Sequence, residues 1–326
     1  MAMMRLRPNA YTEIFREKIG IRKELIDIEV RRAIKGLWLI DDMMIPNRLL
    51  WNYYEMIGGL LRDVNANCKD NTGASRTIRT SGAVPYNPCY LYQGEDTEEL
   101  PFDAYTLTSA TYVTRDAVEA LAHTNYSECK VSATASKDGS SLGILGRFSD
   151  TGGTQRLILL NGVLFDYTSG SPIYCSLKFY EPWVYNIANI WRAWLDKVDA
   201  EGEKDMAGVT YKVRGGSGET VALGVKIALG EGTGAWSPTD YTMTNPFTLS
   251  PTYQEWSSED GYELLIRAWY IPDTDKSIPE IGLVGKLYDD AGGTHDTLLA
   301  RIALETTPLN LTANTLYVIR IRIMGT

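Results

Sequence analysis

The stretch LGILGRFSDTGGT at residues 142–154 recurs, with one residue inserted, as IGLVGKLYDDAGGT at residues 281–294. In this alignment four glycines of the first copy have counterparts in the second, and Gln155 corresponds to His295. Similarity at a fixed spacing indicates a repeated structural unit. A glycine-rich turn between two apolar runs predicts a β-hairpin in each copy. The aligned glycines are Gly143, Gly146, Gly152 and Gly153 in the first copy and Gly282, Gly285, Gly292 and Gly293 in the second.

The similarity extends toward the N-terminus of each copy. DAYTLT at residues 103–108 resembles DYTMT at residues 240–244, and two amphipathic helical patterns, residues 49–64 and 183–198, lie further upstream. The offsets of these blocks differ only by small loop changes. We therefore predict an internal duplication, with a helix plus β-sandwich unit at residues 47–180 and a second such unit at residues 181–326.

The strands of the second unit are the easiest to identify. Residues 316–324 alternate strictly, with Arg320 and Arg322 on one face and three isoleucines on the other, as in a half-buried antiparallel strand. Turn residues separate further strand patterns at short intervals. The predicted fold is mainly β, with two tandem antiparallel β-sandwich or jelly-roll-like domains and with N-terminal and inter-domain helices. The other predicted strands are residues 209–213, 221–229, 262–270, 281–288 and 297–304.

Residues 1–46 form a separate segment in this prediction. Apolar residues between Thr12 and Leu39 recur at mixed three- and four-residue spacing, with acidic residues early and basic residues late. This pattern predicts a charged N-terminal helical arm. Its apolar stripe could pack on the chain's own sandwich or on another subunit.

Composition argues against several classes of protein. The chain has 326 residues and a net charge of −9, so it has no basic field to attract nucleic acid. Five charged or proline residues interrupt the most apolar stretch, residues 37–61, which argues against membrane insertion. No secretory signal is apparent at residues 1–20, so we expect synthesis in the cytoplasm. The four cysteines lack metal-binding spacing and are expected to be free thiols.

Candidates for catalysis are few, because the chain has only two histidines, His123 and His295. The glycine-rich runs at residues 215–220 and 230–234 lack the lysine of a phosphate-binding loop and are expected to be hairpin tips. We therefore predict no enzyme activity, no catalytic or cofactor-binding residues, no metal and no cofactor. Loop calcium is the weighed alternative, with carboxylates as oxygen ligands. Its main candidates are Asp273, Asp275, Asp289 and Asp290, and the other acidic pairs are Asp41-Asp42 and Glu259-Asp260.

Aromatic residues leave a second alternative open. Exposed coplanar rings beside acids or amides would form a carbohydrate platform, whereas buried rings would fill the core. The aromatic candidates are Trp236, Tyr241, Tyr253, Trp256, Trp269, Tyr270 and a cluster from Tyr86 to Tyr92.

The run IALGEGTGAWSPTDYTM at residues 227–243 resembles a pattern of structural proteins from tailed viruses of bacteria and archaea. In those proteins a strand leads to Gly-x-Gly-Thr and then to Pro-x-x-Asp. LLAR at residues 298–301 and the alternating strand at residues 316–324 also resemble them, so the resemblance covers residues 220–326. The first half keeps part of the pattern but has Gly94-Glu-Asp-Thr97 in place of Gly-x-Gly-Thr.

The resemblance implies a virion component, such as a tail, connector, capsid-associated or decoration protein, that acts through contacts with copies of itself and other virion proteins. No catalytic residue is implied. We expect a non-enzymatic virion structural protein, located in the virion, with no nucleic-acid or membrane partner. A double jelly-roll capsid protein and a surface protein that binds a receptor or glycan are the alternatives.

Overall fold

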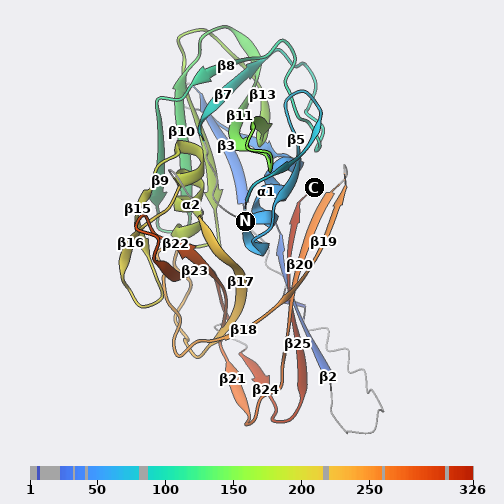
Figure 1. Cartoon of the computed structure of the whole chain (residues 1–326), viewed down its shortest axis with the longest axis vertical. Helices are drawn as coiled ribbons and strands as arrows, with labels where there is room; N and C mark the ends of the chain where they lie inside the picture. The colour runs from blue at the N-terminus through green and yellow to red at the C-terminus, as the bar shows by residue number, and fades with distance from the viewer. Residues whose placement is uncertain are drawn as a thin grey trace.

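The computed structural model describes residues 6–7, 23–31, 34–40, 43–80, 87–215, 220–258, 261–304 and 308–325. The fold is mainly β, and within these residues two helices occur, α1 (Trp51–Arg62) and α2 (Tyr185–Asp196). Both helices lie near the middle of the molecule, between the sheets (Figure 1). Neither twelve-residue helix has the length and apolar character needed to cross a bilayer, and no other described segment is helical in that way.

Strands make up most of the rest of the described chain. The N-terminal strands are β1 (Leu6–Arg7), β2 (Lys23–Arg31), β3 (Ile34–Ile40) and β4 (Met43–Leu49). The first half continues with β5 (Ala66–Lys69), β6 (Ser75–Ile78), β7 (Asn87–Gly94), β8 (Thr111–Thr114), β9 (Ala117–Ala122), β10 (Ser127–Thr134), β11 (Gly139–Ser149), β12 (Gln155–Leu159), β13 (Asn161–Tyr167) and β14 (Pro172–Phe179).

The second half has β15 (Ala200–Lys204), β16 (Thr210–Val213), β17 (Val221–Gly230), β18 (Phe247–Leu249), β19 (Thr252–Ser258), β20 (Gly261–Tyr270), β21 (Lys276–Ile278), β22 (Glu280–Tyr288), β23 (Thr294–Ala303), β24 (Leu309–Leu311) and β25 (Leu316–Gly325).

The helix predicted between Thr12 and Leu39 is wrong for the described residues, because Lys23–Arg31 and Ile34–Ile40 are strands. Residues 12–22 lie outside the described residues. Ile26, Ile28 and Val30 alternate with charged residues, which suits a strand as well as a helix. These residues form strands rather than a helix because β2 pairs with β25 and β3 pairs with β14, two strands that are distant in sequence.

Three sheets contain most of the described strands. A ten-stranded sheet runs β8-β7-β11-β13-β4-β3-β14-β10-β9, with β12 also paired to β11. In the second half the order β18-β17-β22-β23 forms one sheet, and β1-β2-β25-β20-β19 forms another. In the ten-stranded sheet, β4 pairs with β13 and β3 pairs with β14, so the β3–β4 pair connects the group β8-β7-β11-β13 to the group β14-β10-β9. The second half keeps two comparable groups as separate sheets.

The two halves pair their strands in the same register. Between β7 and β11, Leu91 lies opposite Ile144, and between β17 and β22, Ile227 lies opposite Leu283. These pairs are offset by 136 (227 − 91) and 139 (283 − 144) residues. The helices also correspond, since each ends at a residue with left-handed backbone, Asp63 or Lys197. The same pairing geometry is thus formed by two different sequences.

Each helix packs against the sheets of the opposite half. Helix α1 contacts β17 and β20 of the second half, and α2 contacts β7, β9, β10 and β14 of the first. Each helix also contacts strands of its own half, α1 with β5 and β12 and α2 with β15, β16 and β23. The last residue of each helix makes an ion pair across the halves, Arg62 with Glu255 at 2.5 Å and Asp196 with Arg115. Gly58 lets α1 approach β20 closely, because a Cβ there would lie 1.7 Å from the Tyr262 hydroxyl oxygen.

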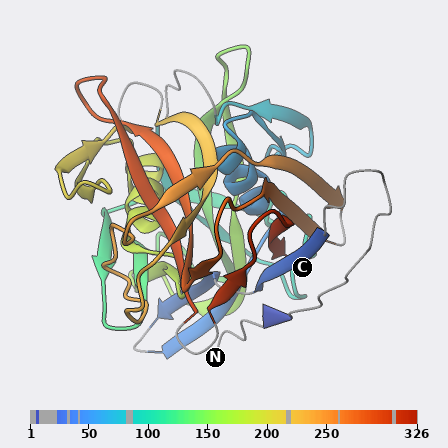
Figure 2. The ribbon, with the colours of Figure 1, turned by 90° about the horizontal axis from the view of Figure 1, so that it is seen from below.

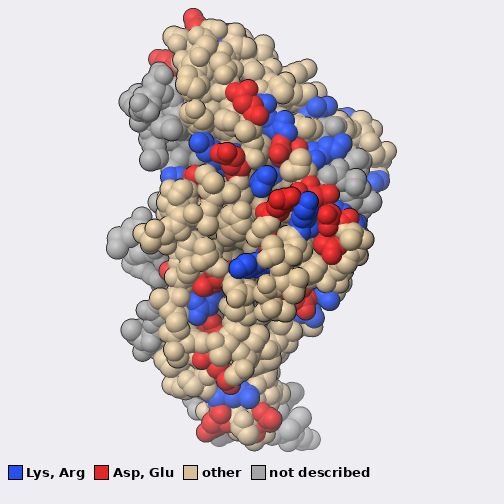
Figure 3. Space-filling model, turned by 90° about the vertical axis from the view of Figure 1, so that its left-hand side faces the viewer, with Lys and Arg blue, Asp and Glu red and all other residues tan. Residues whose placement is uncertain are grey.

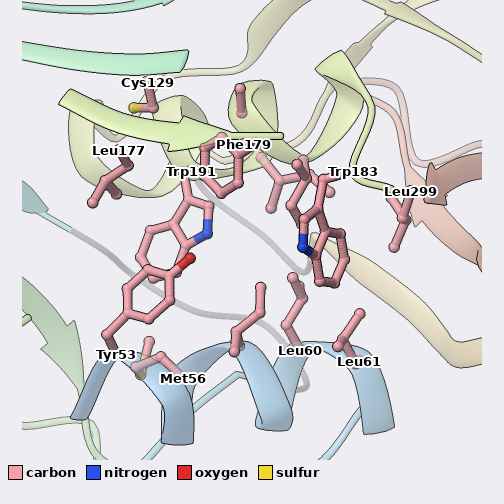
Figure 4. Close-up of a cluster of buried hydrophobic side chains, with 14 of the residues drawn as sticks. Tyr53, Met56, Leu60, Leu61, Cys129, Leu177, Phe179, Trp183, Trp191 and Leu299 are labelled. Carbon is pink, nitrogen blue, oxygen red and sulfur yellow. The ribbon is translucent and has the colours of Figure 1, made fainter. Parts of the chain in front are cut away.

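Because each helix contacts strands of the other half, the two halves share a hydrophobic core (Figure 4). Tyr53 of α1 stacks on Trp191 of α2, with ring centroids 4.8 Å apart. Phe179 from β14 and Leu299 from β23 belong to the same buried cluster. Buried residues from both halves therefore belong to one hydrophobic cluster.

The N-terminal and C-terminal strands lie side by side. Strand β2 pairs with β25 over nine residues, and Figure 2 shows the blue N-terminal strands on the same side of the molecule as the dark red end of the chain. One five-stranded sheet thus contains strands from both ends of the described chain.

Candidate functional site

The most concentrated group of ionisable side chains lies around His295, at the start of β23. Its Nδ1 lies 2.9 Å from Asp205 Oδ2, and its Nε2 lies 3.1 Å from Asp289 Oδ2. The imidazole stacks on Tyr211 of β16, with centroids 4.1 Å apart. Because Asp205 begins the turn of the β15–β16 hairpin and Asp289 the turn between β22 and β23, the histidine links two turns.

The electrostatics of this cluster favour a charged histidine. Burial lowers the pKa of His295, but the hydrogen bonds to Asp205 and Asp289 outweigh that effect and raise it. The pKa of Asp289 is lowered, mainly by the hydrogen bond from His295. Burial raises the pKa of Asp205, yet His295 and two backbone N–H groups bring it below its usual value. Since both ring nitrogens face carboxylates, the arrangement is that of a clamp between turns rather than of a free general base.

The corresponding position in the first half is occupied by arginine. His295 lies opposite Leu287 and Arg156 lies opposite Phe148, so the two residues correspond at an offset of 139 (295 − 156). Arg156 Nε donates to Asp150 Oδ2 at 2.8 Å, as His295 contacts Asp289. The alignment that placed His295 on Gln155 is therefore wrong.

The one-residue insertion assumed in that alignment is the source of the error. In the first turn the N–H of Gly153 donates to the Asp150 carbonyl oxygen, and in the second the N–H of Gly292 donates to that of Asp289. Both glycines have positive φ, 82° and 91°. The left-handed position thus fixes the correspondence, and the two turns have equal length.

The glycine-rich loop after β17 is held from inside the protein. The N–H groups of Gly232 and Thr244 donate to Glu280 Oε1 at 2.9 and 2.7 Å. Arg301 Nε donates to Glu280 Oε2 at 2.6 Å, and Arg301 Nη1 donates to Asp240 Oδ2 at 2.8 Å. Backbone donors that a phosphate loop would offer to a ligand are here bonded to an internal carboxylate.

The remaining predicted candidates are dispersed. His123 contacts Glu128 at 3.1 Å and stacks on Tyr126, far along the chain from the His295 cluster. Asp275 accepts the N–H of Ala313. Across the described residues no group of three or more histidine, cysteine or acidic residues has the arrangement of a metal site. Two acidic pairs, Asp41-Asp42 and Glu259-Asp260, and the start of the Tyr86 cluster lie outside the described residues.

A buried carboxyl group was not singled out by the sequence. Glu203 of β15 is fully buried, and burial raises its pKa to about 8. Asn189 Nδ2 of helix α2 donates to Glu203 Oε2 at 2.7 Å, the partner that stabilises its charged form. The residue lies in the sequence AEGEK, in which no pattern distinguishes Glu203 from exposed Glu201. Only its placement against α2 reveals it.

Two of the aromatic candidates are exposed on one face of a sheet. Trp256 of β19 is 57% exposed and Trp269 of β20 is 44% exposed. Trp256 lies opposite Glu263, and Trp269 is six residues further along β20, so both side chains point to the same side. Six residues of strand correspond to about 20 Å. We call the surface formed by Trp256, Glu263, Leu265, Arg267 and Trp269 the tryptophan face.

The other aromatic candidates are partly or fully buried. Trp236, Tyr241, Tyr253 and Tyr270 are half-buried, and Tyr92 is buried. Arg267 lies over the ring of Trp269, 5.0 Å from the centroid, which adds a cationic group to the tryptophan face.

No protein-family model, no curated protein and no solved structure matches this chain.

Proposed function

We propose that this protein is a non-enzymatic structural subunit of a virion, such as a tail, connector, capsid-associated or decoration component, that acts by contact with other subunits. The tryptophan face is the observation that carries the proposal. Large aromatic residues on an exposed sheet face are typical of protein–protein contacts. The resemblance of residues 227–243 to structural proteins of tailed viruses supports a place in the virion.

The use of the ionisable residues agrees with this proposal. His295, Asp205, Asp289, Glu280 and Arg301 bond to one another or to backbone and thereby hold turns in place. Figure 3 shows Lys and Arg interleaved with Asp and Glu across one face, a distribution typical of a solvated surface.

We also propose that the two halves arose by internal duplication of a helix plus β-sandwich unit. The common registers and the equal helix lengths support it. The second half contains two separate sheets, and in the first half β3 and β4 connect two groups of strands into one sheet. In each half the helix of the other half contacts both groups, which supports the proposal. Such pseudo-symmetry would let one chain fill two similar places in a ring or lattice.

The test is self-association of the full-length chain, measured by light scattering over a concentration series. The wild type is expected to form a discrete oligomer, and the double variant Trp256→Ala/Trp269→Ala is expected to lose it. Tyr112→Ala is the matched control, because Tyr112 is also 57% exposed but lies on β8 in the other half. A wild type that stays monomeric, or variants that associate equally, would contradict the proposal.

Glycan binding is a second candidate, favoured by the guanidinium of Arg267 beside the exposed Trp269 ring. Aromatic rings stack on sugars, and a neighbouring guanidinium can donate hydrogen bonds to sugar hydroxyl groups. A glycan array should then show selective retention of the wild type that Trp256→Ala removes and Tyr112→Ala keeps. Uniformly negative arrays would exclude this candidate for the glycans displayed.

A further inference from the structure

The C-terminal strand β25 is flanked by β20 on one side and by the N-terminal strand β2 on the other. The β2–β25 pairing is parallel and runs from Lys23 opposite Leu316 to Arg31 opposite Met324. The equivalent strand of the first half, β14, is flanked by β10 and by β3, and there β3 pairs antiparallel. The two C-terminal strands of the halves thus each take a strand from the N-terminal segment.

A single extended segment covers both of these edges. Only residues 32 and 33 separate β2 from β3. Strand β2 pairs parallel with β25, and β3 pairs antiparallel with β14. This is expected if β2 and β3 run in one direction past two equivalent strands that run in opposite directions. An uncovered strand edge exposes a row of unpaired N–H and C=O groups, which readily recruit another strand.

The two parts of the segment are held to different degrees. Strand β3 lies between β14 and β4 and is paired on both sides. Strand β2 is paired along its whole length only to β25, while its outer side meets the two-residue strand β1 at Asp27 and Ile28. An identical strand from another copy could therefore replace β2 without any change in the number of pairings, which makes such an exchange inexpensive.

The register specifies which strand fits the β25 edge. Asp27 lies opposite Arg320 and Glu29 lies opposite Arg322, so acidic positions face basic ones. The positions between them pair isoleucine or valine with isoleucine. Opposite charges across a strand pair favour pairing, and like charges disfavour it. The sequence complementary to β25 is that of β2 itself, so the partner that fits this edge is a second copy of the chain.

We propose that β2 is exchanged between two copies of this protein, each chain donating residues 23–31 to the β25 edge of the other. Strand β3, which is paired on both sides, remains on its own chain as the anchor. This inference rests on the self-association proposed above, but it uses the edge of β25 rather than the tryptophan face.

Two full-length charge-reversal variants test the exchange. The donor variant is Asp27→Arg/Glu29→Arg, and the acceptor variant is Arg320→Glu/Arg322→Glu. Each variant alone has mismatched β2 and β25 strands, whether these pair within one chain or between two. Mixed together, both strand pairs of an exchanged heterodimer are charge-matched. Circular dichroism of each variant checks that the rest of the chain is folded.

The expected result is a 1:1 species of twice the 36.4 kDa chain mass that forms in the mixture and is at least tenfold less populated in either variant alone. Light scattering after mixing differently tagged variants measures it. A mixture that contains only the species of its separate components would overturn the exchange. Loss of association in Trp256→Ala/Trp269→Ala is read separately, so the function can stand where the exchange fails.

A cysteine pair gives a second reading that does not depend on charge-variant folding. In Glu29→Cys/Arg322→Cys, mild oxidation should give disulfide-linked dimers if β2 is exchanged. Only cross-linked monomers should form if β2 stays on its own chain, and this result would overturn the proposal. The wild type controls for its own cysteines, of which Cys68, Cys89 and Cys129 are buried.

Discussion

At the scale of single residues, Glu203 is a carboxylic acid that is fully buried in the protein. It lies on β15 against helix α2, where Asn189 donates a hydrogen bond to Oε2 of its carboxyl group while Oε1 accepts none from the described residues. Burial without a countercharge disfavours ionisation, which explains a pKa near 8. The folded protein therefore holds a proton that the unfolded chain releases near pH 4.5.

Glu203→Gln is predicted to become more stable than the wild type as the pH rises. A raised carboxyl pKa lowers the wild-type free energy of unfolding between about pH 4.5 and 8, by up to about 1.4 kcal/mol per pH unit. Glutamine cannot ionise, so the two proteins should agree at pH 4.5 and diverge toward pH 8. Urea unfolding across this range measures the difference. Glu201→Gln, on the same strand but exposed, is the control, and parallel pH curves for Glu203→Gln and the wild type would refute the prediction.

The His295 clamp gives a second pH effect. Its raised pKa means that its stabilising contribution is complete below the unfolded value of about 6.5 and is lost as the pH rises through the folded value. Asp205→Asn is predicted to lower the pKa of His295, because it removes one of the two carboxylates. Imidazole NMR titration measures this directly, since the chain has only two histidines. Asp296→Asn is the control, because Asp296 is adjacent to His295 in sequence but does not bond to its ring, so the pKa of His295 should stay unchanged. An unchanged His295 pKa in Asp205→Asn would contradict the clamp.

At the scale of elements, one asparagine near the start of each helix fastens it to strands. Asn52 Nδ2 donates to the carbonyl oxygens of Lys69 and Leu159, and Asn186 Nδ2 donates to those of Lys204 and Leu298. Each side chain therefore bridges the hairpin that follows its helix and a strand of a neighbouring sheet, β12 for Asn52 and β23 for Asn186. Neither helix has a side-chain hydrogen bond at its N-cap, so these contacts locate the helix ends.

Asn52→Ala and Asn186→Ala are each predicted to lower the free energy of unfolding by about 1–3 kcal/mol. The reason is that buried carbonyl oxygens lose their donor without gaining water. Chemical denaturation of the two variants gives the values, and similar losses are expected because the contacts correspond. Asn310→Ala, on exposed β24, should stay within about 0.5 kcal/mol of the wild type. A loss in only one of the two helices would show that the sites are not equivalent.

At the scale of the whole molecule, the contacts of each helix with strands of the other half couple the stability of the two halves. Helix α1 cannot leave its place without exposing β17 and β20, which belong to the other half. The buried cluster runs from Leu49 to Ile323 with contributions from both halves. Cooperative unfolding is expected of a single continuous core.

The chain is predicted to unfold in one transition. Far-UV circular dichroism and tryptophan fluorescence should give the same midpoint in urea. Leu60→Ala should lower the free energy of unfolding by about 2–5 kcal/mol, the cost of a buried cavity, and so lower the midpoint without splitting the curve. Exposed Leu223→Ala is the control. Two resolved transitions would mean that the halves fold independently.

Sequence alone determined the β-rich class, both helices and most strands of the second half. These features depend on local period and on turn residues, which are written in adjacent positions: residues 316–324 alternate, and residues 49–64 and 183–198 have apolar stripes. The glycine-rich turns after Asp150 and Asp289 were also predicted, although their alignment was wrong by one residue, because only the left-handed glycine of each turn reveals the register.

Tertiary structure alone decided the rest. Residues 23–31 and 34–40 form strands because β25 and β14 offer them partners, and no local pattern records a partner such as β25, nearly 300 residues away from β2. The packing of each helix against the other half, the burial of Glu203 and the joint exposure of Trp256 and Trp269 depend on which faces of the helices and sheets pack together. Local sequence fixes how a segment can fold, whereas the burial of apolar area and the satisfaction of backbone groups fix where it packs, and these depend on the whole chain at once.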